Sequence, residues 1–328
     1  MHMRGWRRDS RITGSPQQDG QPVHPITPGA TQMTTRHSPL STFHALSFDI
    51  EDWFHIVEVA AVDNPAEWPA LSARSSLVER YTDLILKLCD DANTTATFYI
   101  LGWIAEHHPD LVRRIADAGH EIGTHSFWHR KVYELDEETF AKDIRDSIDA
   151  ITAAAPGVEV KSFRAPSFSI IEGTEWALDV LLDLGIEHDA SLFPARRGHG
   201  GYPCPRAIHQ ITTPKGRTLW EIPMSVMDLG PRKVCYCGGG YLRLLPLSLI
   251  ERGIAQQARA GRPTVVYLHP RDFAPDCPRV PMPMHRRFKC YVGMRSTEGK
   301  LRRLLDRYAW GTCADVIRKD HESDPLRG

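Results

Sequence analysis

Three acidic residues follow the apolar start of the segment HALSFDIEDWFH at residues 44–55. Asp49, Glu51 and Asp52 come directly after an alternation of small and apolar residues, a pattern typical of a buried strand. A carboxylate at the end of such a strand is costly to bury unless an oppositely charged group pairs with it. The segment therefore predicts that basic side chains from other parts of the chain meet these acids.

Four basic residues follow other β-rich stretches and are candidates for that pairing. His125 and His129 belong to GHEIGTHSFWHR, Arg164 to FRAPSF and His269 to VVYLHP. In a parallel barrel the carboxyl ends of the strands meet on one face, where active sites lie. We expect the acids and these basic residues to converge there. The alternative is structural, because a strand-end histidine is commonly only hydrogen-bonded and an arginine commonly lies on the surface.

The spacing of His125 and His129 is that of one helical turn, which would put both imidazoles on one side. Two imidazoles and a carboxylate form a three-ligand site with open positions, as catalytic divalent cations need. No glutamate follows His125, so the H-E-x-x-H motif of metalloproteases is excluded. Taken alone, such a pair is more often two unrelated histidines, and the nearby carboxylates are what favour a metal site.

The elements that must position these residues alternate along the chain. Helical periodicity covers about 75–91, 104–118, 137–154, 174–184, 247–260 and 298–308, and β-rich stretches such as TTATFYILG and PTVVYLHP separate these segments. This alternation favours parallel strands with crossover helices. We therefore expect a single α/β barrel-like domain over residues 43–318, with elaborated loops at 190–245 and 271–297.

Composition excludes several classes of protein. The 328 residues are 41% hydrophobic and 25% charged, with a formal net charge of −1, so bulk charge gives no reason to expect nucleic acid as a partner. No apolar run approaches the ~20 residues of a membrane-spanning helix.

Residues 1–42 are expected to be a disordered extension. They lack the apolar stretch of a signal peptide, so a cytoplasmic location is expected. Seven cysteines without regular pairing argue against a disulfide framework.

The order of several motifs resembles that of a known family. SFDIEDWF, GHEIGTHSFWH, FRAPSFSI, DASLFP and YLHP look, in that order, like the motifs of polysaccharide deacetylases with NodB homology. CGGGYLRLLP and CYVGMRSTEGKLRRLL resemble the C-terminal extension of the subgroup associated with exosortase and exopolysaccharide gene clusters. The resemblance implies a distorted (β/α) barrel of about seven parallel strands, with the extension at about 271–318 and a tail at 319–328.

The resemblance also implies a role for each motif residue. Asp49 would be the catalytic base, held by Arg164, and His269 the general acid. Asp189 of DASLFP would orient the catalytic histidine. His125 and His129 would be ligands of a divalent metal, with zinc expected.

The third metal ligand stays open between two residues. The commonest family pattern has two adjacent aspartates, whereas Ile50 follows Asp49 here. Strand alternation puts Glu51 on the same face as Asp49, which favours Glu51. Asp52 fits if the strand has already turned.

The function implied is hydrolysis of linear amides that are not peptide bonds. The enzyme would remove N-acetyl groups from the amino sugars of a polysaccharide, expected to be an exopolysaccharide, and release acetate. An allantoinase-like hydrolase of a small cyclic amide resembles the same fold and is the first alternative. The second is an inactive glycan-binding module, which would need neither an acid nor a base.

Overall fold

β1 (Phe43–Ile50) is the strand around which the sheet is arranged, and it is buried from His44 to Ile50. It pairs in parallel with β2 (Thr97–Ile100), β10 (Val265–Leu268) and β11 (Ala309–Gly311). Neighbours on both edges and cover on both faces explain why its sequence is almost continuously apolar up to Asp49. The computed structural model describes residues 42–57, 59, 62–195 and 201–323.

The main sheet has nine strands in the order β10-β1-β2-β3-β4-β5-β7-β6, with β11 beside β1. The strands not yet bounded are β3 (Glu121–Thr124), β4 (Ser162–Phe163), β5 (His188–Asp189), β6 (His209–Thr212) and β7 (Thr218–Glu221). The seven from β10 to β7 run parallel, and β6 is antiparallel to β7. The expected α/β class with mostly parallel strands is confirmed. β10 and β6 pair with each other nowhere in the part of the chain that the structure describes.

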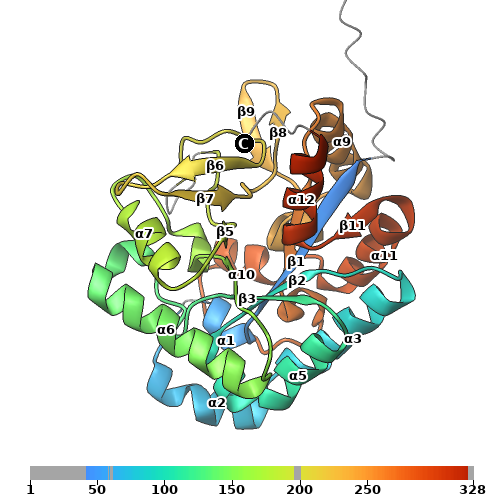
Figure 1. The fold of residues 1–328 in the computed structure, drawn as a ribbon. Helices are drawn as coiled ribbons and strands as arrows, with labels where there is room; N and C mark the ends of the chain where they lie inside the picture. Colours follow the sequence, from blue (N-terminus) through green and yellow to red (C-terminus); the bar gives the residue numbers. More distant parts are fainter. Residues whose placement is uncertain (1–41, 58, 60–61, 196–200, 324–328) are drawn as a thin grey trace, which may run out of the picture. The chain divides into compact units, whose positions relative to one another are not determined.

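Helices flank this sheet, and Figure 1 shows α3, α5, α6 and α7 ranged around the strands. The helices are α1 (Trp53–Ile56), α2 (Trp68–Ser75), α3 (Val78–Asp91), α4 (Gly102–His107), α5 (Pro109–Asp117), α6 (Glu137–Ala154), α7 (Trp176–Asp183), α8 (Gly239–Leu244), α9 (Leu247–Arg259), α10 (Met284–Tyr291), α11 (Thr297–Arg307) and α12 (Cys313–Ser323). None of the described helices is long and apolar enough to cross a lipid bilayer.

The prediction of a single helix at 104–118 is wrong, because this segment forms two helices. Pro109 begins α5, and His108 between α4 and α5 has φ −132° and ψ 55°. Proline cannot donate a backbone hydrogen bond and disfavours a helical residue before it, so it starts a helix more readily than it continues one.

Sequence periodicity also missed short elements at both ends of the second half. Within the loop expected at 190–245, the strand predicted in TLWEIPMSV is confirmed as β7, but β6 and an antiparallel hairpin of β8 (Val226–Leu229) and β9 (Arg232–Cys235) were not predicted. Helix α12 continues past residue 318, into the segment expected to be a tail. The extension expected at 1–42 lies almost wholly outside the described residues.

Gly123 in β3 allows the side chains of the neighbouring strands to pack closely. Gly123 is in register with Tyr99 of β2, and a Cβ added there would lie 2.7 Å from both the Tyr99 ring and the Ser162 carbonyl oxygen. Such distances are too short for any side chain. The absent Cβ therefore leaves room for the Tyr99 ring between β2 and β4.

We expect Gly123→Ala to lower the free energy of unfolding by about 1–3 kcal/mol, because the new methyl group overpacks a buried site. Gly299→Ala is the matched control. Gly299 is exposed in α11, and a Cβ added there would meet no atom within 4 Å, so alanine should stabilise that helix by about 0.5–1 kcal/mol. Urea denaturation followed by circular dichroism measures both, and a Gly123→Ala protein as stable as wild type would contradict this packing.

Candidate active site

Asp49 and Arg164 form a buried ion pair at the end of β1. Arg164 Nη1 donates to Asp49 Oδ1 at 2.7 Å, and the two side chains, Arg164 and Asp49, are 0% and 3% exposed. Burial alone would raise the pKa of Asp49, but the positive charges of Arg164 and His269 bring that pKa below its usual value. Asp49 is therefore an ionised carboxylate in a site without bulk water.

Arg164 is itself fixed from three directions. Its Nη1 also donates to Ser47 Oγ at 2.9 Å, and its Nε donates to the Ala190 carbonyl at 3.2 Å. The guanidinium lies over the Tyr99 ring, 4.2 Å from its centroid. This packing leaves the guanidinium little freedom, so it holds Asp49 in one orientation.

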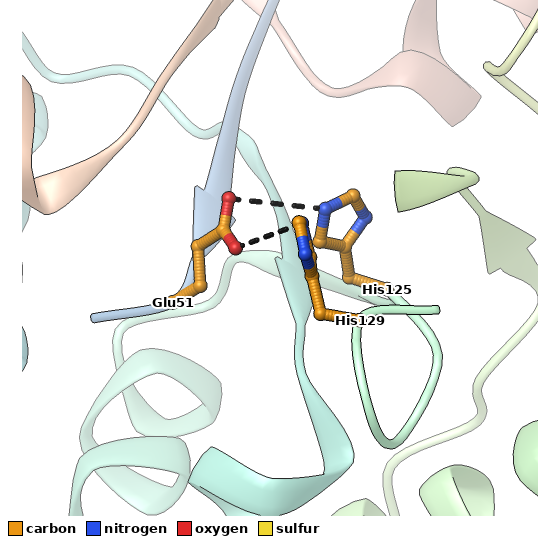
Figure 2. A group of neighbouring side chains, drawn as sticks. All are labelled: Glu51, His125 and His129. Atoms are coloured by element: carbon orange, nitrogen blue, oxygen red, sulfur yellow. Dashed lines mark ion pairs between the residues drawn. The ribbon is translucent and has the colours of Figure 1, made fainter. Parts of the chain in front are cut away.

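Glu51, His125 and His129 form the one group of potential metal ligands found among the described residues. Figure 2 shows Glu51 at the end of β1 facing both histidines, which come from the loop after β3. His129 Nε2 lies 3.0 Å from Glu51 Oε2, and His125 Nε2 lies 4.0 Å from Glu51 Oε1. Their ligand atoms all lie within 4.8 Å of one another, close enough to share one ion.

The tautomer of His125 supports a cation at this position. Its Nδ1 lies 2.7 Å from the Arg164 carbonyl oxygen, which can only accept, so Nδ1 carries the proton. Burial lowers the pKa of His125, which favours the neutral ring with a lone pair on Nε2. That lone pair faces a carboxylate oxygen of Glu51, and two such groups repel each other unless a cation lies between them. A hydrogen bond that fixes the far nitrogen is the usual support of a metal-ligating histidine.

The loop that carries the two histidines is not the helical turn that their spacing suggested. Ser126 and His129 have positive φ angles of 69° and 55°, so the backbone turns sharply between the two histidines. Asp143 of α6 holds the loop by accepting from the backbone N–H of Phe127 at 2.8 Å. The imidazoles converge through this tight loop, and the helical spacing rule gave the right outcome for a wrong reason.

Asp52 lies outside the group of Glu51, His125 and His129. Its carboxylate caps α1, accepting from the Trp53 N–H at 2.8 Å, and it also accepts from the Leu77 N–H and the Ser76 hydroxyl. These bonds satisfy the oxygens that a metal would need. Of the two residues left open by the sequence, the geometry favours Glu51 as a ligand.

His269 is held by an acid that the motif residues did not include. Its Nδ1 donates to Asp272 Oδ2 at 2.9 Å, and Arg243 Nε lies 2.9 Å from Asp272 Oδ1. Burial alone would lower the pKa of His269, but Asp272, Glu51 and Asp49 raise it to about 9. The signal was present in HPRDF, where an acid three residues after His269 has the spacing of a capping box.

The nitrogen of His269 that faces the site is close to both strand-end acids. Nε2 lies 3.7 Å from Asp49 Oδ2 and 3.5 Å from Glu51 Oε1. A carboxylate and a protonated imidazole therefore lie side by side next to the three possible metal ligands. This arrangement can remove a proton from one atom and deliver a proton to another.

The expectation that Asp189 orients His269 is not met, because Asp272 is the acid in contact with its Nδ1. Asp189 of β5 is opposite Glu221 of β7 in the sheet, and both carboxyls are buried. Burial raises the pKa of both groups, and that of Glu221 lies well above its usual range, since the pair cannot carry two charges. The pair secures the segment whose Ala190 carbonyl accepts from Arg164, so Asp189 acts on the site only indirectly.

A cleft of about 760 Å³ opens beside His129. Trp128 lines this cleft, whereas Trp53 and Phe54 are 3% and 1% exposed and belong to the core. Of the three aromatic residues that flank the motifs, only Trp128 is placed to stack on a sugar ring.

Comparisons with known proteins agree with this geometry. Residues 72–187 match the family model described as polysaccharide deacetylase, and residues 190–318 match a domain of unknown function (DUF3473). The first match contains His125, His129 and Arg164, and the second contains His269. Asp49 and Glu51 precede both matches.

Two curated relatives are deacetylases. A chitooligosaccharide deacetylase of Rhizobium leguminosarum bv. trifolii is 36% identical over 25% of this chain and 39% of its own length. A peptidoglycan-N-acetylglucosamine deacetylase of Bacillus cereus is 33% identical over 30% of this chain and 36% of its own length. The chain thus spans less than two-fifths of each relative.

Two solved structures share the fold. One is a Mycobacterium smegmatis protein assigned as a polysaccharide deacetylase, with a TM-score of 0.56 and 20% identity over 92% of this chain and 96% of that one. The other is the Puue allantoinase, with a TM-score of 0.57 and 13% identity over the same shares. At such identities the likeness shows the fold alone.

We propose Glu51, His125 and His129 as ligands of one divalent ion, and amide substitutions test the choice of acid. Glu51→Gln should lose most of the bound zinc, because the ligand charge is gone. Asp52→Asn should keep about one zinc per chain, since Asp52 caps a helix, although it should lower the melting temperature. Metal analysis of the purified proteins measures this, with His125→Ala as the positive control for loss. The assignment fails if Asp52→Asn loses zinc while Glu51→Gln keeps it.

Proposed function

We propose that this chain, which contains a polysaccharide deacetylase domain followed by a DUF3473 region, hydrolyses the N-acetyl groups of amino sugars in a polysaccharide. The products would be acetate and a free amine on the sugar. One observation carries the proposal. An ionised Asp49, a protonatable His269 and three potential metal ligands come together from the ends of β1, β3 and β10, with His269 Nε2 3.7 Å from Asp49 Oδ2 and 3.5 Å from Glu51 Oε1.

The metal fits the residues present. Two imidazoles and one carboxylate are the donor set of many catalytic zinc sites, which keep a further position open, and we therefore propose zinc. A divalent cation bound by Glu51, His125 and His129 would polarise the acetamide carbonyl and lower the pKa of a water molecule. The chain's own part is to hold these ligands in place through the Arg164 carbonyl and Asp143.

The two proton transfers belong to Asp49 and His269. Asp49 accepts the proton of the attacking water, because its lowered pKa keeps it deprotonated and Arg164 fixes its orientation. His269, protonated beside Asp272, donates from Nε2 to the amide nitrogen as the carbon–nitrogen bond breaks. One water is consumed, and the acetyl group leaves as acetate.

The proposed substrate is an N-acetylated glycan, and an exopolysaccharide is the specific proposal. Support comes from the names of the curated relatives, which act on chitooligosaccharide and peptidoglycan, and from Trp128 in the adjoining cleft. The likeness to the allantoinase concerns the fold and gives no reason to prefer a cyclic amide.

We expect Asp49→Asn and His269→Ala each to lower the rate of acetate release from an N-acetylglucosamine oligomer by ~10²-fold or more. Neither change should remove the bound zinc, because neither residue is a proposed ligand. Acetate release and metal content are measured on the same protein samples. If His269→Ala keeps near-normal turnover, His269 is a structural residue and the proposed mechanism is wrong. If allantoin reacts and no acetylated oligomer does, the allantoinase-like alternative replaces the proposal.

Asp272 should extend activity toward higher pH. Its charge raises the pKa of His269, and the protonated imidazole is the active form, so loss of that charge lowers the pKa and ends activity at lower pH. A bound cation lowers the same pKa, so only the difference between variants is informative. We expect Asp272→Asn to move the basic limb of the pH–rate profile down by about one unit or more. Asp272→Glu should restore much of the shift, and an unmoved basic limb in Asp272→Asn would contradict this role.

A further inference from the structure

The cleft beside His129 is built from three separate parts of the chain. Trp68 of α2 contributes one part of the lining, the loop after β3 contributes Trp128 and Arg130, and α10 contributes Lys289. At about 760 Å³ the cleft is large enough for more than the acetamido group itself. A substrate that reaches the proposed metal ligands therefore extends along these walls.

The cleft is more basic than the chain that forms it. The chain has 40 Lys and Arg against 41 Asp and Glu. The residues that line the cleft include four Lys and Arg (Arg130, Lys131, Arg286, Lys289) and two Asp and Glu (Asp63, Glu134). The excess is local, and it lies where the substrate would lie.

Two of these cations lie at the surface of the cleft outside any ion pair among the described residues. Lys131 lies 3.8 Å from Glu134, and Arg286 donates to the Val57 carbonyl, so both have protein partners. Arg130 and Lys289 are exposed, and neither forms an ion pair with any residue that the structure describes. Their positive charges are available to a ligand.

The wall between these cations and the centre suits a sugar. Trp128 lines the cleft with a partly exposed ring, and Trp68, which is 3% exposed, supports it from behind with its ring centroid 6.1 Å away. His55 lines it too, is 3% exposed, and its Nε2 has no hydrogen-bond partner among the described residues. Its Nδ1 accepts from the Asp52 N–H, so the neutral ring carries its proton on Nε2. The wall thus combines an aromatic face with an unused N–H donor, as carbohydrate sites do.

We infer that the cleft binds a sugar residue that bears a carboxylate, next to the N-acetylated residue whose acetyl group is removed. Arg130 and Lys289 pair with the carboxylate, and Trp128 contacts the ring. The inference rests on the proposed function, because it places the reacting acetamido group at the centre formed by Glu51, His125 and His129. It names the substrate class as an acidic glycan.

A matched pair of ligands isolates the carboxylate. One is a tetrasaccharide of alternating glucuronic acid and N-acetylglucosamine, and the other is the same molecule with its carboxylates reduced to alcohols. Calorimetric titration of the full chain at about 0.01 M and about 1 M salt compares them, because the screening length falls from about 30 Å to about 3 Å. We expect the acidic ligand to bind at least about fivefold more tightly at low salt, and the preference to vanish at high salt.

Variants place that preference in the cleft. Arg130→Ala and Lys289→Ala should each weaken the acidic ligand by about two- to fivefold and leave the reduced ligand unchanged. Lys87→Ala removes an equal charge from α3, where Lys87 pairs with Asp91, and should change neither affinity. Equal affinity of wild type for the two ligands, or no binding of the acidic one, overturns the inference. So does an equal loss in the Lys87→Ala control.

The same samples separate this inference from the proposed activity. If the protein releases acetate from both ligands and binds them with equal affinity, the result would support deacetylation and contradict the acidic subsite. If the protein binds the acidic ligand selectively but releases acetate from no acetylated glycan, the result would support the subsite and contradict the proposed deacetylase activity.

Discussion

Asp49 and Glu51 are two buried carboxylates at the end of β1, each 2% exposed, and the surrounding site compensates their charge. Two like charges in a water-poor site repel each other and lose their hydration, which is tolerable only beside positive partners. Arg164 neutralises Asp49 directly, whereas Glu51 has only imidazoles near it. The unequal compensation explains why the first suits a base and the second a metal ligand.

Around these two carboxylates, which precede both matched regions, each region contributes a different part of the site. Arg164, His125 and His129 come from the deacetylase region, and the clamp on His269 comes from the DUF3473 region. In that clamp Arg243 also donates to the Cys290 carbonyl at the end of α10, the helix that carries Lys289. The C-terminal region thus joins the support of the proposed general acid to a wall of the cleft.

Much of the fold and of the site could be predicted from sequence because strand ends and helix periods are local signals. The convergence of Asp49, Glu51, His125, His129, Arg164 and His269 followed from the rule that parallel strands end on one face. Short strands such as β6 and β9 carry too few residues to show a period, so they were missed.

The wrong predictions for the site concern features that are determined by contacts between distant parts of the chain. The pairing of Asp189 with Glu221 across the sheet has no local signal, whereas the contact of Asp272 with His269 had one in the capping-box spacing of HPRDF, which was not used. The left-handed backbone at Ser126 and His129 depends on Asp143, which lies in another element. The assignment of Asp52 to a helix cap required the position of Ser76 and Leu77.

Anomalous diffraction at the zinc absorption edge, on crystals of the full chain grown with zinc, tests the proposed centre most directly. A single strong peak should lie between Glu51, His125 and His129, about 2.0–2.2 Å from one carboxylate oxygen and two imidazole nitrogens. Asp49 should remain paired with Arg164 and outside the coordination sphere. A peak held by Asp52, or no peak at the three residues, would contradict the arrangement.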